Sequence, residues 1–347
     1  MEIGMVDLIP AFNFEDVVLA PWQGGFSTEQ PSTPMAFWQA LMGFLVGGAC
    51  GLVGNYLILR RMALVGDAIS HSVLPGLVVA FLISGTRGSA AMFVGALAAG
   101  ILTTVIIEAI HRNSRIKQDA AIGIAFTTLF AIGVILISLF AGQVDLDQEC
   151  VLYGEIGSVP LEEPAIMAGK TLGPASLVRM AAVFVVTILL IVVFYKELLV
   201  SSFDPALACS LGINATVMHY GLMCWLSVVV VSAFESVGAI LVIAMLILPG
   251  ATATLLTQRL PRIMCISLIH CAFSSLLGVH LAYWLNCSMA AAMVVAGAAL
   301  FTLTWIFSPT QGLLRRAMHK LLTTNEQLAA EVPSAAEGAS PVGRPFY

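Results

Sequence analysis

Two residues that could bind a cation, Asp67 and His71, stand four positions apart inside the largely apolar stretch 60–81. On a helix this spacing places both side chains on one face, one turn apart, so that they can converge on one point. A carboxylate or an imidazole in hydrocarbon costs on the order of several kcal/mol unless it faces a bundle interior, a water-filled cavity or an ion. Carboxylate oxygen and neutral imidazole nitrogen both suit Zn²⁺ and Mn²⁺. The pair therefore predicts a divalent-cation site, and the alternative is a local cap beside a hydrogen-bonded packing histidine.

Two prolines inside apolar stretches predict breaks in the helices that carry them. Pro75 lacks the N–H that would bond to the carbonyl of His71 four residues earlier, and its ring tends to kink the helix. Pro249, which Gly250 follows, has the same relation to the carbonyl of Met245. We therefore expect Pro75 and Pro249 to be helix breaks at which the bundle can gate.

The composition is that of a membrane protein. Of the 347 residues, 59% are hydrophobic and only 10% are charged, and the mean hydropathy is +0.97. Such a chain is an all-α polytopic membrane protein surrounded by lipid. The net charge of −5 says little, because the charges are concentrated in loops and tails, and no basic field indicates nucleic acid as a partner. The seven cysteines form no CxxC pair, so we interpret them as small packing residues rather than a disulfide framework or a zinc cluster.

Apolar runs predict nine transmembrane helices. The run at 35–59 is crowded with glycines, which indicates close helix contacts inside the bundle. The joints at 235–236 and 286–287 are very tight, so eight spans with one re-entrant segment are the alternative. The nine spans are residues 35–59, 62–84, 90–110, 119–141, 176–195, 214–234, 237–256, 262–285 and 288–307.

The distribution of charge predicts how the spans are oriented. With nine spans, most of the lysines and arginines fall on one side of the membrane and the acidic break 142–174 falls on the other. The positive-inside rule then places the N-terminus outside and the C-terminus in the cytoplasm. We divide the chain into an extracytoplasmic segment 1–34, a transmembrane domain 35–307, and a cytoplasmic tail 308–347 that we expect to be disordered.

The cytoplasmic loop 197–213 predicts a short capped helix at 205–211. Asp204 suits the N-cap, Pro205 suits the first helical position, and Gly212 suits the C-terminal stop. A capped helix facing the cytoplasm could dock a soluble partner, and a simple interfacial connector is the alternative.

Several motifs that are typical of enzymes are absent from the sequence. The one Gly–Lys pair, Gly169–Lys170, has Pro164 where a phosphate-binding loop needs its leading glycine. The sequence contains no HExxH motif and no nucleophile–base pair. We therefore do not expect an enzyme, and any ATP hydrolysis must come from a separate subunit. His219 is alone, and we assign it no chemistry, as with His270 and His280, which do not share a helical face well.

Four stretches together resemble the permease subunits of bacterial ATP-binding-cassette importers for manganese, zinc or iron. They are GNYLILRRMALVGDAISHSVLPG at 54–76, AIGIAFTTLFAIGVIL at 121–136, FDPALACSLGI at 203–213 and SVGAILVIAMLILPGATA at 236–253. The resemblance is spread over about residues 50–307, nearly the whole membrane region, and the combination of the stretches is specific. Residues 1–34 and the C-terminal tail lie outside the pattern.

The resemblance implies a type II importer-like bundle in a bacterial inner membrane. It also implies a homodimeric permease, two ATP-binding-cassette ATPase subunits and an extracytoplasmic metal-binding protein. Asp67 and His71 would then be ligands on the metal pathway. The metal is a transported ion rather than a tightly bound cofactor. The loop 203–213 would dock into the ATPase, and its residues carried over from the family pattern are Phe203, Asp204, Pro205 and Gly212.

The alternative to an ATP-driven permease is an ion channel or a proton-coupled secondary metal transporter. In that case Asp67 and His71 would relay protons or bind the ion without ATP. The capped cytoplasmic loop favours the ATP-driven permease. An aspartate with a histidine suits Mn²⁺, Fe²⁺ and Zn²⁺ alike, so the sequence does not choose among these metals.

Overall fold

The structure is a computed structural model that describes residues 13–22, 34–85, 89–140, 156–162, 164–167, 170–308 and 312. Most of the predicted N-terminal segment, most of the predicted tail and residues 141–155 of the acidic break lie outside the described residues. The main helices are α1 (Met35–Leu59), α2 (Val65–Ser84), α3 (Ser89–Asn113), α4 (Gln118–Phe140), α6 (Ala175–Val193), α7 (Tyr195–Phe203), α8 (Pro205–Ser210), α9 (Ala215–Leu256), α10 (Leu260–Leu285) and α11 (Met289–Phe307).

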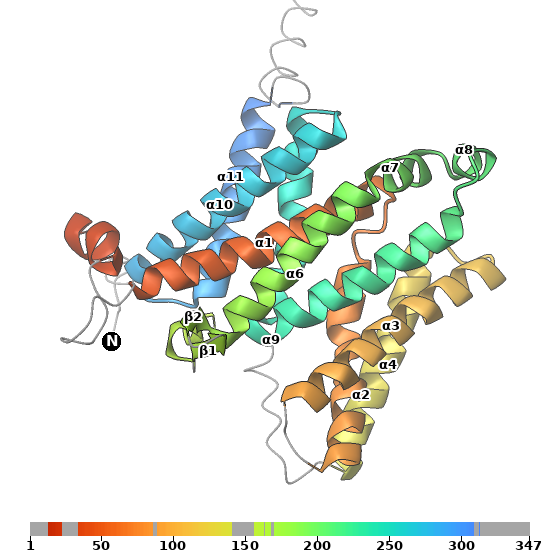
Figure 1. Ribbon diagram of the computed structural model, residues 1–347, viewed down its shortest axis with the longest axis horizontal. Coiled ribbons are helices and arrows are strands. Elements are labelled where there is room, and N and C mark those ends of the chain that lie inside the picture. Colours follow the sequence, from red (N-terminus) through yellow and green to blue (C-terminus); the bar gives the residue numbers. More distant parts are fainter. Residues whose placement is uncertain are drawn as a thin grey trace, which may run out of the picture.

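The helices form two groups that α9 connects (Figure 1). Helices α2, α3 and α4 pack together on one side of the molecule, and α1, α6, α10 and α11 form the other group. Helix α9 contacts members of both groups. The bundle is therefore all-α through its membrane region, as predicted, and α9 is the element that holds its two parts together.

Eight helices in the described part of the chain are long and apolar enough to cross a membrane. Seven have 19 to 26 residues, whereas α9 has 42. At 1.5 Å per residue, a straight helix of this length would be about 60 Å long, roughly twice the thickness of the hydrocarbon layer. Its backbone leaves the helical region at Gly238, where φ is 77° and ψ is 169°. Glycine adopts this conformation readily because it has no Cβ.

The part of α9 before Gly238 runs antiparallel to α6. The indole Nε1 of Trp225 donates a hydrogen bond to Thr187 Oγ1 at 3.0 Å, and Glu235 forms an ion pair with Arg179 at 3.2 Å. Residue numbers therefore rise along α9 as they fall along α6. Helix α6 runs in the same direction as α1 beside it.

The part of α9 after Gly238 runs parallel to α1. A Cβ added at Gly47 would lie 3.3 Å from Met245, and one added at Gly51 would lie 3.4 Å from Pro249. The chain therefore reverses its direction at Gly238. The two parts of α9 correspond to the predicted spans 214–234 and 237–256, so the eight helices contain the segments of all nine predicted spans.

Glycines allow the closest helix contacts, as their density in 35–59 predicts. A Cβ at Gly54 of α1 would lie only 2.0 Å from the carbonyl oxygen of Leu246 in α9. A Cβ at Gly76 of α2 would lie 2.2 Å from the carbonyl oxygen of Gly95 in α3. Neither position has room for a side chain, so these glycines set the distance between the paired backbones.

The loop before α6 contains local structure that sequence reasoning missed. A short 3₁₀ turn, η3 (Val159–Leu161), is followed by an antiparallel hairpin of β1 (Pro164–Met167) and β2 (Lys170–Pro174). The amide of Gln39 in α1 donates to the carbonyl of Gly157 at 3.1 Å and ties this loop to the bundle. We call this end of the molecule the hairpin end.

A short N-terminal segment also packs at the hairpin end. It consists of η1 (Glu15–Leu19) and η2 (Ala20–Trp22). His280 of α10 contacts both of its turns: Nδ1 lies 2.9 Å from the carbonyl oxygen of Val17, and Nε2 accepts from Trp22 Nε1 at 3.4 Å. Part of the predicted extracytoplasmic segment 1–34 is therefore folded against the bundle.

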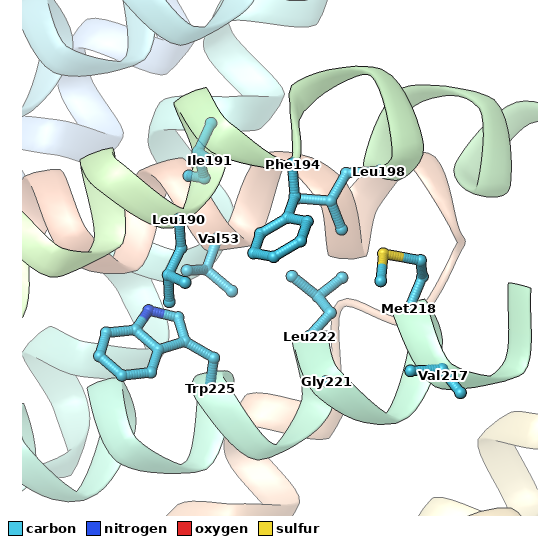
Figure 2. A pocket seen from close by; sticks show the side chains of 10 residues that line it. All are labelled: Val53, Leu190, Ile191, Phe194, Leu198, Val217, Met218, Gly221, Leu222 and Trp225. Carbon is cyan, nitrogen blue, oxygen red and sulfur yellow. The ribbon is translucent and has the colours of Figure 1, made fainter. Parts of the chain in front are cut away.

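Helix α7 was also not predicted, because its sequence was interpreted as a loop. It forms because Leu198 is buried, and Figure 2 shows this side chain together with Val53 and Leu222 around an apolar cavity of about 200 Å³. The polar residues around Leu198 hide this contact from a hydropathy pattern. The segment between α6 and α9 is thus two short helices, α7 and α8, rather than one helix in a loop.

The close approach of α1 and α9 gives a test of the fold. Gly54→Ala should lower the free energy of unfolding by about 1–3 kcal/mol, because the new methyl group collides with the backbone of α9. The matched change is Gly123→Ala in α4, where an added Cβ meets no atom within 4 Å. That variant should be neutral or more stable, by up to about 1 kcal/mol, because alanine favours the helix. Thermal unfolding in detergent measures both, and equal losses of stability would contradict the close contact.

Candidate metal site and coupling site

Asp67 and His71 lie together on one face of α2, as their spacing predicts. Nε2 of His71 is 3.3 Å from Oδ1 of Asp67. Both side chains keep about a third of their surface exposed, at 34% for His71 and 32% for Asp67. The pair is therefore accessible to an ion from outside the helix rather than sealed in the core.

The face of the pair points toward α4. The imidazole ring of His71 lies 5.9 Å from the ring of Phe126 and 6.0 Å from the ring of Phe130, measured between centroids. These aromatic rings restrict the imidazole on one side. They also lower the polarity next to the pair, which strengthens electrostatic attraction to an ion there.

The described residues offer two ligands to a cation at this position. Among them, no group of three or more His, Cys, Asp or Glu side chains could hold a metal ion. A structural zinc site needs four ligands, so the pair by itself is not such a site. An incomplete ligand set with open positions suits an ion that must bind and leave again.

The two prolines lie in helices that support the pair. Pro75 is buried, and its ring packs against Gly133 of α4, where an added Cβ would lie 2.9 Å from Pro75 Cδ. Pro249 packs against α1, and Leu246 one turn earlier contacts Gly66, the neighbour of Asp67. Both helices continue through their prolines, and the non-helical residue of α9 is Gly238 rather than Pro249. The gating role of Pro75 and Pro249 remains a prediction.

The predicted capped helix is present as α8. Oδ1 of Asp204 accepts hydrogen bonds from the backbone N–H groups of Ala206 and Leu207, both at 3.0 Å. Pro205 occupies the first turn, and Gly212 has a φ of 79° directly after the helix. Local residue types therefore predict this element correctly.

The tip that carries α8 exposes large apolar side chains. Phe203 is 61% exposed, Leu207 49% and Leu211 62%. The tip protrudes at one end of the molecule (Figure 1), which we call the α8 end. Exposed apolar side chains on a protruding element indicate a surface that another protein covers. This candidate coupling site lies on α7 and α8, apart from the Asp67–His71 pair on α2.

A cluster of polar side chains that sequence reasoning missed lies at the α8 end. Arg60, the first residue after α1, donates from Nε to Ser202 Oγ and from Nη2 to Ser201 Oγ, both at 3.0 Å. Its Nη1 lies 3.1 Å from Nδ1 of His219 in α9. His219 is therefore part of a network rather than an isolated residue.

The network continues into α3. Nε2 of His219 lies 3.1 Å from Oε2 of Glu108, and Arg112 donates from Nε to the other carboxylate oxygen. Glu108 is buried, at 7% exposure. The one part of this network that the sequence indicates is the Glu108–Arg112 pair, because an acid and a base four residues apart on a helix can form an ion pair. Nothing in the sequence connects that pair with Arg60 or His219.

Comparisons with known proteins agree with this architecture. The sequence pattern of the ABC 3 transport family matches residues 32–308 of the chain. The chain is 43% identical over 290 residues to the manganese transport system membrane protein MntD of Bacillus subtilis, covering 84% of this chain and 97% of that protein. It is 44% identical over 278 residues to the zinc transport system membrane protein TroD of Treponema pallidum, covering 80% of this chain and 75% of that protein.

A solved structure shares the fold as well. The structure of PsaBC from Streptococcus pneumoniae in complex with Fab matches with a TM-score of 0.66 and 35% identity, over 81% of this chain and 94% of that chain. The sequence matches and the structural match each extend over most of the bundle. With eight helices in its described part that are long and apolar enough to cross a membrane, the chain belongs to the ABC 3 transport family.

Proposed function

We propose that the chain is the permease subunit of an ATP-driven importer for divalent transition-metal ions. The Asp67–His71 pair on one face of α2, in a chain of this transport family, carries the proposal. Manganese and zinc are the metals in the names of the two relatives. Iron also binds carboxylate and imidazole ligands, so the pair is compatible with manganese, zinc or iron.

In the proposed cycle, Asp67 and His71 hold the ion while it crosses the membrane. The carboxylate offsets part of the ion's charge, and the neutral imidazole supplies a nitrogen ligand. Water, backbone carbonyls or groups from a second copy of the chain complete the coordination. The apolar rings of Phe126 and Phe130 keep the imidazole facing the ion.

ATP is hydrolysed by separate ATPase subunits that dock on α8. The sequence has no phosphate-binding loop, so the chain itself supplies the pathway and the docking surface. Phe203, Leu207 and Leu211 provide the apolar contact, and Asp204 holds the docking helix in shape. An extracytoplasmic metal-binding protein delivers the ion at the hairpin end, and two copies of the permease form the pathway in the bacterial inner membrane.

The proposed orientation places the hairpin end outside and the α8 end in the cytoplasm. Arg60, Arg112 and Lys196 all lie toward the α8 end, as the positive-inside rule requires. The N-terminus is then extracytoplasmic and the C-terminus cytoplasmic.

Two native cysteines test this orientation. Cys209 on α8 and Cys287 between α10 and α11 are both exposed, and the proposal places them on opposite sides of the membrane. Each is kept as the single cysteine, and intact cells are treated with a membrane-impermeant thiol reagent. Cys287 should react in intact cells, whereas Cys209 should react only after the membrane is permeabilised. Labelling of Cys209 from outside would overturn the orientation.

Removing either metal ligand tests the pathway. Asp67→Asn and His71→Ala should each reduce ATP-dependent Mn²⁺ uptake by at least about tenfold, because even outer-shell partners of a metal contribute roughly 10–100-fold. Uptake is measured in proteoliposomes that contain permease, ATPase and binding protein. Both changes make the site easier to bury, so loss of folding does not explain the loss of uptake. Ser72→Ala, which removes a buried hydroxyl from the same helix, is the control and should transport normally.

The same assay separates the proposal from a proton-coupled carrier. Protons compete with metal for the imidazole nitrogen, so uptake should fall as the pH is lowered. With ATP held constant, an uncoupler should leave uptake unchanged. Uptake that collapses with the proton gradient would favour the carrier, and full uptake in both ligand variants would exclude the shared metal site.

The cap of α8 gives a test of docking. Asp204→Ala removes both hydrogen bonds to the helix N-terminus and should destabilise α8 by about 1 kcal/mol. Copurification of the ATPase and Mn²⁺ uptake should both decrease, while the permease keeps its affinity for Mn²⁺. Asp204→Asn keeps an oxygen acceptor for the cap and should retain docking. Equal docking by the alanine and asparagine variants would show that α8 is only a connector.

A further inference from the structure

The network around Arg60 joins four separate parts of the chain at one guanidinium group. Arg60 stands in the turn after α1, its two serine partners lie on α7, and His219 lies on α9. Through His219 the network reaches Glu108 on α3. The cluster borders a cavity of about 420 Å³ at the α8 end.

The chemistry of the network allows one assignment of its protons. Arginine carries only donors and stays protonated in proteins, although burial lowers the pKa of the Arg60 guanidinium. Nδ1 of His219 must therefore accept from Arg60, which leaves the ring proton on Nε2. That proton is donated to Glu108, whose other oxygen accepts from Arg112. Each bond in the series has one donor and one acceptor, so the geometry of the cluster is well defined.

Arg60 also stands directly before the helix of the metal ligands. The turn at 60–64 is held by hydrogen bonds from the N–H of Arg60 to Tyr56 and from the N–H of Met62 to Leu57, at 3.0 and 2.8 Å. Helix α2 begins at Val65, and Asp67 lies in its first turn. A displacement of Arg60 therefore acts on α2 through a few residues of backbone.

The docking helix has few other connections to that part of the bundle. Helix α8 contacts α7 and α9, and α7 buries only Leu198 and Ser201. Ser201 and Ser202 of α7 accept hydrogen bonds from the guanidinium of Arg60. These bonds connect α7 directly to the turn before α2. Helix α7 also contacts α1, α6 and α9.

We infer that Arg60 is a positioning residue that transmits movement of α7 and α8 to α2, and so to Asp67 and His71. The inference rests on the proposed function, because α8 must bind the ATPase for this movement to occur. When docking displaces α7, its two serines pull on the planar fork of Arg60, and the turn at 60–64 shifts the start of α2. His219 and Glu108 hold the other side of the fork and connect α3 to the same movement.

Arg61 is a neighbouring arginine to compare with Arg60. It is exposed, and it has the same charge and nearly the same distance from α2 as Arg60. The positive-inside rule accounts for either residue as a charge at the membrane surface. It does not account for a half-buried guanidinium that bonds to three side chains from two other helices.

The test compares the same substitution at the two neighbouring positions. Arg60→Lys and Arg61→Lys both keep the positive charge, but lysine cannot hold three partners in a planar fork. Permease, ATPase and binding protein are reconstituted in proteoliposomes, and Mn²⁺ uptake and ATP hydrolysis are measured together. Arg60→Lys should reduce the number of Mn²⁺ ions imported per ATP hydrolysed by about tenfold, within the usual range of coupling between two sites. Arg61→Lys should leave this ratio unchanged.

A second variant acts on the same contact from α7. The double substitution Ser201→Ala with Ser202→Ala removes the acceptors and keeps Arg60. It should lower the ratio of import to hydrolysis as well, and combining it with Arg60→Lys should cause little further loss, because one contact is removed twice. The amount of ATPase that copurifies should be normal in all these variants.

The outcomes separate the inference from the proposed function. If wild-type proteoliposomes import no Mn²⁺ with ATP, the proposed function fails. If the wild type imports Mn²⁺ and Arg60→Lys keeps the wild-type ratio, only the role of Arg60 is wrong. The same holds if uptake and hydrolysis fall in proportion, because a merely structural arginine would lower both through the amount of assembled protein. An equal fall of the ratio in Arg61→Lys would also overturn the inference, since it would trace the effect to charge alone.

Discussion

Hydrocarbon provides no hydrogen bonds, and this constraint governs where the polar groups of the bundle lie. Asn55, near the C-terminal end of the buried helix α1, accepts from Ser267 Oγ of α10 at 3.0 Å. Glu108 near the end of α3 is paired with His219 and Arg112. Most hydroxyl groups on the spans bond back to a carbonyl one turn earlier, as Ser227 does to Met223. Many polar groups in the bundle are therefore held in local or paired contacts, whereas the Asp67–His71 pair keeps about a third of its side-chain surface exposed.

The same constraint divides the molecule into a rigid part and a part that can move. Helix α1 and the second part of α9 touch through backbone atoms at Gly54, and this contact leaves no freedom for sliding. Helices α7 and α8 bury few side chains, and polar contacts secure them to the rest. A hydrogen bond can be exchanged at low cost, whereas a close backbone contact cannot be moved without opening a void. Force applied at α8 should therefore pass along α7 to Arg60 before it deforms the packed core.

The sequence predicts the elements whose causes are local. Runs of apolar residues predict the nine spans, because the thickness of the membrane sets their length. The cap of α8 follows from Asp204, Pro205 and Gly212, which act only on neighbouring backbone groups. The spacing of Asp67 and His71 likewise places them on one face of α2. In each case the relevant contacts are made within a few residues.

Other features depend on residues that are distant in the chain, and the sequence does not predict them. Arg60 and His219 are 159 positions apart, and His219 and Glu108 are 111 positions apart. No periodicity relates such residues, because the packing of four helices brings them together. Helix α7 was missed for the same reason, since Leu198 finds its apolar partners on α1 and α9. The reversal at Gly238 is an intermediate case: the sequence predicts two spans with a very tight joint at 235–236, and the structure places the joint at Gly238.

If Asp67 and His71 bind the transported ion, as we propose, their position at the start of α2 fits what transport requires. An ion must bind well enough to enter the pathway and weakly enough to leave it. Two ligands on one turn of a helix do not change their mutual distance when that helix moves as a rigid body. What changes is their distance from groups on other helices, such as Phe126 and Phe130 on α4, or from ligands that a second copy supplies. On this proposal, a small displacement of α2 changes the affinity for the ion without disturbing the pair. The turn that begins at Arg60 is where we infer that such a displacement is applied.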